Sequence, residues 1–115
     1  MKRFLLATLV GLMIFTADAR AAVDPRYKAE QSALIKCNQL WSAKLSVQRG
    51  DPYSLARKAQ QLCAGQEAAY QRAMRPILYY KEVADRHMRK IRAFQLKSNA
   101  AMIVKVRALM TKRKR

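Results

Sequence analysis

The sequence predicts an all-α fold, in which a disulfide-clamped antiparallel helical hairpin and one or two further helices form a small three- to four-helix bundle. Only 3 Gly and 3 Pro occur among 115 residues, too few for the many turns of an all-β sandwich. Apolar residues make up 51% of the chain and recur at helical spacings of three and four. Two cysteines lie at equal distances on either side of one glycine. This length allows a single domain.

The first 21 residues have the layout of a cleavable secretory signal peptide. Positions 2–3 are both basic, and twelve uncharged residues follow at positions 4–15. This apolar run falls short of the roughly 20 residues that a membrane-spanning helix needs. We therefore expect export to the periplasm or the extracellular space. Small residues favour cleavage after Ala21, and cleavage after Ala19 or Ala22 is an alternative.

Two identical cap signals delimit the predicted hairpin. Asp24 before Pro25 resembles an N-cap followed by proline at the first helical position, and Gly50 offers a C-terminal stop. Asp51 before Pro52 repeats the start signal at once. The expected apolar face of the first helix comprises Leu34, Cys37, Leu40, Trp41, Leu45 and Val47. That of the second comprises Leu55, Ala59, Leu62, Cys63, Tyr70, Ala73 and Met74.

A disulfide bond between Cys37 and Cys63 follows from the symmetry of this hairpin. Each cysteine is thirteen residues from Gly50, and residues equidistant from the turn come level in an antiparallel pair of helices. The same relation places Leu45 opposite Leu55. An even number of cysteines in an exported chain usually forms disulfides, although two buried thiols are the alternative. In the chain-entropy model the bond stabilises the fold by about 3–4 kcal/mol.

A third helix is predicted after Pro76, which either ends the second helix, kinks it, or begins the third. Acidic residues precede basic ones by four positions, in Glu82 with Arg86 and in Asp85 with Arg89, and such pairs support a helix. The expected apolar face comprises Tyr80, Val83, Ala84, His87, Ile91 and Phe94.

Ser98 and Asn99 interrupt the helical pattern and divide the mature chain into two parts. Residues 22–98 are predicted to form the helical domain, and residues 99–115 a basic amphipathic helix and tail. The apolar stripe of this last helix comprises Met102, Ile103, Val106, Leu109 and Met110.

The positive charge is concentrated at the C-terminal end. The whole chain carries 24 Lys and Arg against 7 Asp and Glu, a formal net charge of +17. Residues 86–115 hold eleven bases and no acid, which predicts an anion-binding arm. Its expected anion-binding residues are Arg86, Arg89, Lys90, Arg92, Lys97, Lys105, Arg107, Lys112, Arg113, Lys114 and Arg115.

No constellation of catalytic or metal-binding residues is recognisable, so we expect no enzyme, cofactor or metal site. His87 is the only histidine and is interpreted as a packed structural imidazole, whereas zinc would need three or four ligands. Residues 79–94 contain both aromatic and basic side chains, and such a stretch could bind single-stranded nucleic acid by stacking on its bases. Because Tyr80 and Phe94 are assigned to the buried face, only Tyr79 is expected to be exposed there.

The leading hypothesis is an exported, non-enzymatic binding protein whose cationic arm engages an anionic partner in the cell envelope. This partner would be a lipid headgroup or a polyanion, and binding would bury apolar residues of the last helix: Met102, Ile103, Val106 and Leu109. One alternative is a protein-interaction subunit or inhibitor in an envelope or secretion complex, whose last helix docks into an acidic groove. The other is extracytoplasmic nucleic-acid binding. The oligomeric state is not predicted.

Overall fold

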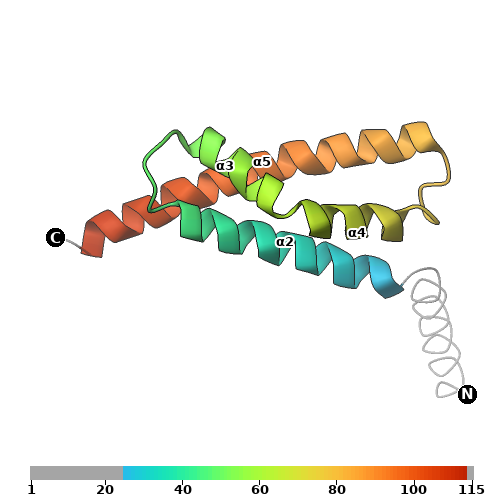
Figure 1. The fold of residues 1–115 in the computed structure, drawn as a ribbon, viewed down its shortest axis with the longest axis horizontal. Coiled ribbons are helices and arrows are strands. Elements are labelled where there is room, and N and C mark those ends of the chain that lie inside the picture. Colours follow the sequence, from blue (N-terminus) through green and yellow to red (C-terminus); the bar gives the residue numbers. More distant parts are fainter. Residues whose placement is uncertain (1–24, 114–115) are drawn as a thin grey trace, which may run out of the picture.

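The computed structural model describes residues 25–113, and this part of the chain is all-α, as predicted. It contains α2 (Pro25–Leu45), α3 (Pro52–Leu62), α4 (Ala64–Met74) and α5 (Lys81–Arg113) (Figure 1). The predicted signal peptide, the predicted Asp24 cap and the last two anion-binding candidates, Lys114 and Arg115, lie outside the described residues.

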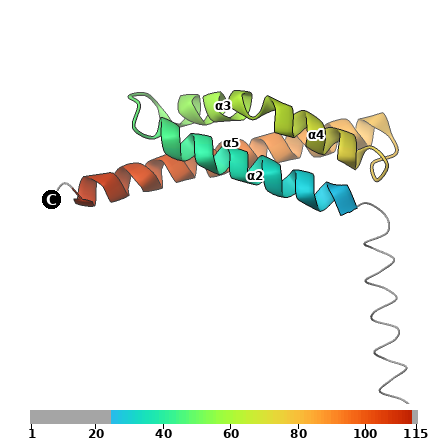
Figure 2. The same ribbon diagram turned by 60° about the horizontal axis from the view of Figure 1, so that its bottom comes forward.

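The four described helices form a bundle in which α3 and α4, placed end to end, together take the place of one helix. Helix α2 runs antiparallel to α3 and α4, which follow each other along one side of it, and α5 returns alongside them (Figure 1). In a second view, turned by 60°, the end of α5 still extends beyond the connection between α2 and α3 (Figure 2). The last turns of α5 therefore project from the bundle.

Two apolar clusters hold the helices together. One joins α2, α3 and α5 through Leu45, Leu55, Ala56, Ala59, Ala100 and Ile103. The other joins α2, α4 and α5 and comprises Leu34, Cys63, Tyr70, Met74 and Met88. Trp41 packs against both clusters. Alanines on both α3 and α5 allow these two helices to approach closely, and this fixes the position of α5.

The predicted disulfide between Cys37 and Cys63 is present and connects α2 to the joint between α3 and α4. The two Cα atoms are 5.9 Å apart, and the Cys63 side chain is fully buried. Leu45 and Leu55 lie in one cluster, as the mirror relation predicts. The predicted pairing of residues equidistant from Gly50 is thus confirmed for the two cysteines and the two leucines.

The first helix ends earlier than predicted. Helix α2 stops at Leu45, and Gly50 lies in the connection, with a φ of 139° that favours glycine. Val47 is therefore in the turn and 71% exposed, and Leu40 points away from the core, so both assignments to the buried face are wrong. The second cap is confirmed, because Asp51 Oδ2 accepts hydrogen bonds from the backbone N–H groups of two residues, Tyr53 and Ser54.

The predicted second helix is two helices. Cys63 is both the C-cap of α3 and the N-cap of α4. Its backbone φ and ψ, −101° and 16°, are not those of an α-helix. Pro76 ends this segment, since α4 stops at Met74, whose carbonyl oxygen accepts hydrogen bonds from the N–H groups of Ile77 and Leu78. Helix α5 begins only at Lys81.

The predicted helix break at Ser98 and Asn99 is wrong, because α5 continues through both residues. Asparagine disfavours helices where its side chain competes for the backbone. Here the Asn99 amide is buried and donates instead to Asn38 Oδ1 at 2.7 Å and to the Ala56 carbonyl at 3.4 Å. A partner on another helix removes that competition.

Candidate functional site

Arg107 stabilises the turn between α2 and α3. Its Nε donates to the carbonyl oxygen of Ser46 at 3.0 Å, and its Nη2 donates to those of Gln48 and Gly50 at 2.7 and 3.0 Å. These oxygens follow the end of α2 and have few backbone partners. The guanidinium, predicted to bind an external anion, is thus already engaged within the chain.

Arg92 is engaged in the same way. Its Nε donates to Glu67 Oε1 at 3.0 Å, the one ion pair among residues 27–113, and this contact joins α4 to α5. The Arg92 carbonyl oxygen also accepts a hydrogen bond from Gln60 Nε2 at 2.7 Å. The expected helical pairs, Glu82 with Arg86 and Asp85 with Arg89, are not formed. The acids at the start of α5 therefore leave Arg86 and Arg89 unpaired.

Five of the remaining cations of α5 gather on one side of the helix, which we call the basic face. Five exposed residues define it: Arg86, Lys90, Lys97, Lys105 and Lys112. At 3.6 residues per turn they lie within about 100° of the helix circumference. Their span of 26 residues corresponds to about 39 Å along the axis, at 1.5 Å per residue. Arg89 points about 100° away from Lys90, and Arg113 points about 100° away from Lys112, so both lie outside this set.

Apolar side chains alternate with the cations on the basic face. Val83, Phe94 and Val104 are all exposed, and Phe94 is 68% exposed. The expectation that Phe94 and Tyr80 are buried is therefore wrong. The buried stripe of α5 runs instead through Met88, Gln95, Asn99, Ala100 and Ile103. Two of these inward positions, Gln95 and Asn99, carry amide side chains. The apolar pattern of the sequence therefore assigns the neighbouring Phe94 to the buried stripe in place of Gln95.

This arrangement also changes which residues of the last helix could meet a partner. Ile103 is fully buried in the bundle and cannot be inserted elsewhere, contrary to the expected mechanism. Leu109 is exposed, whereas Met102 and Val106 are half-buried. The sequence signal for the exposed face was the seven-residue spacing of Val83, Lys90, Lys97 and Val104.

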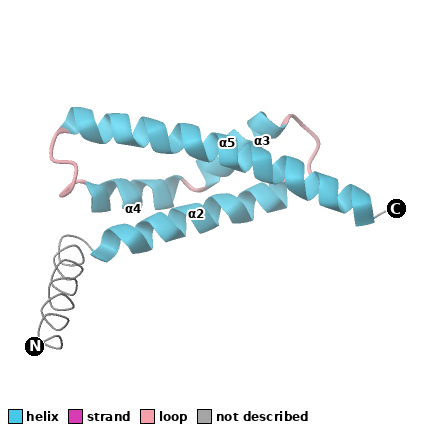
Figure 3. Ribbon diagram, turned by 180° about the vertical axis from the view of Figure 1, so that it is seen from behind, coloured by secondary structure: helices cyan, strands magenta, loops and turns pink. Residues whose placement is uncertain are grey.

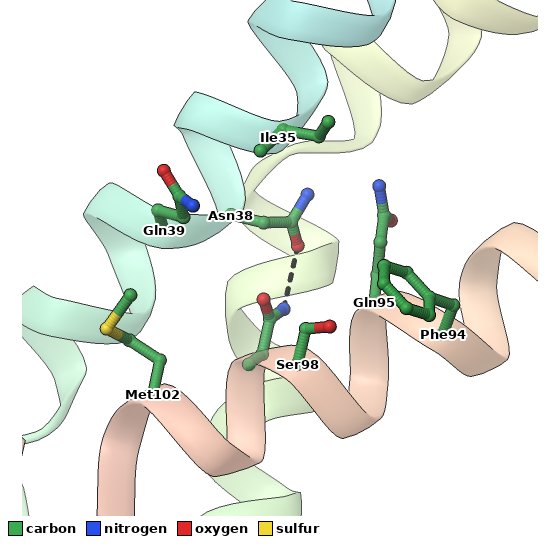
Figure 4. Close-up of a pocket in the computed structure, with 8 residues that line it drawn as sticks. Ile35, Asn38, Gln39, Phe94, Gln95, Ser98 and Met102 are labelled. Atoms are coloured by element: carbon green, nitrogen blue, oxygen red, sulfur yellow. Dashed lines mark hydrogen bonds between the residues drawn. The ribbon is translucent and has the colours of Figure 1, made fainter. Parts of the chain in front are cut away.

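A groove of about 340 Å³ lies between α2 and α5, next to the basic face (Figure 4). Its lining consists of Ile35, Asn38, Gln39, Phe94, Gln95, Ser98, Asn99 and Met102. The hydrogen bond between Asn38 and Asn99 crosses between the two helices at this point. Ser98 carries the one hydroxyl group of this lining, and none of the lining residues has a carboxylate, imidazole, thiol or amine that could activate it as a general base. Phe94 belongs both to the groove and to the basic face.

His87 packs against α4, as a structural imidazole would. Its Nε2 is 2.8 Å from the hydroxyl oxygen of Tyr70, and both side chains are at least partly buried. Burial raises the pKa of Tyr70, and the neighbouring Tyr27 raises it further. Among residues 25–113 no three His, Cys, Asp or Glu side chains lie close enough together to hold a metal ion.

Comparison with protein-family models, curated proteins and solved structures yielded no match. None of the helices between residues 25 and 113 combines the length and apolar character that a membrane span requires. The argument for function therefore depends on the basic face and on the residues beside it.

Proposed function

We propose that this protein is an exported, non-enzymatic binding protein whose basic face binds an anionic surface in the cell envelope. One observation carries the proposal: five cations line one exposed side of α5, and no acid follows Asp85 in the sequence. Arg92 and Arg107 have partners within the chain, whereas these five have no ion-pair partner in the described residues. Their charge is free to meet an external anion.

An extended partner fits this geometry better than a small anion. The cations are spread along about 39 Å of helix instead of converging on a pocket. Each base close to an anionic surface contributes roughly 1 kcal/mol, and salt screens this attraction. The five together can supply a useful affinity only when the partner carries many phosphate or carboxylate groups along one surface.

Export is supported by the signal-peptide layout of the first 21 residues and by the disulfide. Disulfide bonds persist in oxidising compartments such as the periplasm and are rare in the cytosol. The bond between Cys37 and Cys63 lies at the centre of the bundle, where both clusters meet Trp41. An extracytoplasmic location would expose the basic face to lipid headgroups and envelope polyanions.

The test compares two variants with the same loss of charge. In the face variant, Lys90, Lys97 and Lys105 are changed to Gln, whereas in the control variant the changes are Lys36→Gln, Arg57→Gln and Arg72→Gln. All six positions are exposed. Binding to polyphosphate and to phosphatidylglycerol vesicles is measured at low and high salt.

We expect the face variant to lose about two orders of magnitude in affinity for vesicles, from roughly 1 kcal/mol for each lysine. The control variant should keep most of its affinity for both probes. Equal losses in the two variants would show that net charge alone attracts the anion, and would overturn the proposed site.

A second candidate function is supported by the projecting end of α5. Beyond Arg107 this end carries Leu109 and Met110 beside Lys112 and Arg113, and the shallow pocket there is lined by α5 residues alone. Such an end could dock into an acidic groove on a subunit of an envelope or secretion complex. Truncation after Arg107 should then abolish capture of that subunit, whereas vesicle binding, which loses only Lys112 of the basic face, should weaken about fivefold.

A further inference from the structure

We infer that the anionic surface is a lipid bilayer, in which α5 lies parallel to the membrane plane with the Phe94 ring inserted among the headgroups. This inference rests on the proposed function, because it names the partner of the same basic face. The observation that carries it is the alternation of exposed apolar and cationic side chains. A soluble polyanion would neutralise the lysines and would leave the apolar side chains in water.

Phe94 is the central residue of this arrangement. It lies four residues after Lys90 and three before Lys97, so two ammonium groups flank its ring on the same side of the helix. The ring is 68% exposed, although the groove beside it has space. Lysines and an aromatic side chain on one face are typical of helices that lie in the membrane interface.

The first turn of α5 extends the same pattern. The Tyr80 carbonyl oxygen accepts a hydrogen bond from the Ala84 N–H, so Tyr80 begins the helical repeat three residues before Val83. Tyr80 is 70% exposed and stacks edge-to-face on the exposed Tyr79, with ring centroids 5.6 Å apart. Tyrosine rings favour the boundary between headgroups and water, because one end of the ring is apolar and the other polar.

The acids near the basic face lie at its start and at its side. Asp85 precedes Arg86 and points about 100° away from it, whereas Glu82 lies one turn before Arg86, at the N-terminal end of the face, and points about 40° from it. Asp51 lines a shallow pocket with Lys97 and Lys105 at the side of the face. Its carboxylate already accepts two backbone N–H groups as the cap of α3.

The shape of the molecule also suits a flat partner. Helix α5 is fixed to the bundle through its opposite side, by Met88, Asn99 and Ile103. Seen from behind, α5 crosses in front of α3 and is not covered by another described helix (Figure 3). A bilayer could thus contact the basic face along the length of the helix.

The decisive test removes the ring and keeps the charge. Phe94→Ala is compared with Leu40→Ala, which removes another exposed apolar side chain, from α2. We expect Phe94→Ala to bind phosphatidylglycerol vesicles about tenfold more weakly, while its affinity for polyphosphate is unchanged. Leu40→Ala should match the wild type with both probes. If Phe94→Ala binds vesicles with wild-type affinity, the bilayer inference is overturned. The proposed function fails on a different result, namely that the face variant binds both vesicles and polyphosphate like its control variant.

A second readout reports the position of the ring directly. Phe94→Trp and Leu40→Trp each add one indole to the constant emission of Trp41, the only native tryptophan. With anionic vesicles, Phe94→Trp should shift its emission to shorter wavelength and be quenched by brominated lipid chains, whereas Leu40→Trp should do neither. An unchanged spectrum of bound Phe94→Trp, or an equal shift with polyphosphate, would contradict insertion.

Discussion

The guanidinium of Arg107 on α5 holds the carbonyl oxygen of Gln48, 2.7 Å from its Nη2, in the turn between α2 and α3. Together with its bonds to Ser46 and Gly50, this contact joins segments that are almost sixty residues apart in sequence. It sets Arg107, like Arg92, apart from the cations of the basic face.

Replacement of Arg107 by Ala should lower the free energy of unfolding by about 1–3 kcal/mol, because three carbonyl oxygens lose a charged donor. The exposed neighbour Lys105 provides the control, and Lys105→Ala should change stability by less than about 0.5 kcal/mol. Urea unfolding monitored by circular dichroism measures both. Equal stability of the two variants would refute the structural role of Arg107.

Loss of the disulfide should destabilise the bundle more than any single surface change. The variant in which Cys37 and Cys63 are both Ala should lose about 3–4 kcal/mol in unfolding free energy, according to the chain-entropy model. Reductant should destabilise the wild type and leave this double variant unaffected. If reductant has no effect on the unfolding midpoint of the wild type, the bond does not stabilise the folded protein.

The buried amide pair should couple α2 to α5. Asn99→Ala leaves Asn38 Oδ1 without its donor and should cost about 1–3 kcal/mol. The double variant of Asn38→Ala with Asn99→Ala should cost less than the sum of the single changes, by about 0.5–3 kcal/mol. Ser98→Ala, at an exposed neighbouring position, serves as the control. Additive effects in this cycle would mean that the pair contributes no coupling.

Tyr70 should make the protein sensitive to alkaline pH. Because burial raises the pKa of Tyr70 above its ordinary value of 10.0, the folded state holds the hydroxyl proton more tightly than the unfolded state. The contribution of the buried, protonated Tyr70 hydroxyl to the stability of the fold is complete below pH 10, and it is lost as the pH rises through the folded-state pKa. Tyr70→Phe should therefore lose less stability than the wild type between pH 9 and 11, whereas Tyr53→Phe, at an exposed position, should follow the wild type.

Local signals predict the hairpin well. Asp51 before Pro52 marks the start of α3, and the equal distances of Cys37 and Cys63 from Gly50 identify the disulfide. These features depend on short-range chemistry and on the constant rise of a helix, which can be read from one sequence. The break at Cys63 carries no such local signal, since only Gly65, inside α4, weakens the helix there.

The exposed side of α5 was predicted wrongly because two of the inward positions are polar. Gln95 and Asn99 are buried, and the latter has its partner on α2, sixty-one residues away in sequence. A periodic pattern of apolar residues then selects Phe94 for the core, although tertiary packing turns it to the solvent. The concentration of charge in residues 86–115 was visible from the start, but the separation of Arg92 and Arg107 from the basic face required the contacts between helices.

Backbone amide NMR of the mature protein during titration with polyphosphate tests the central claim most directly. The account predicts that the largest chemical-shift changes occur along the basic face, at residues such as Lys90, Lys97 and Lys105, and that they diminish with added salt. Amides on the outer side of α2, near Lys36 and Leu40, should remain unchanged. Changes centred on α2 or on α3 and α4, or spread evenly over all exposed cations, would contradict the assignment of anion binding to α5.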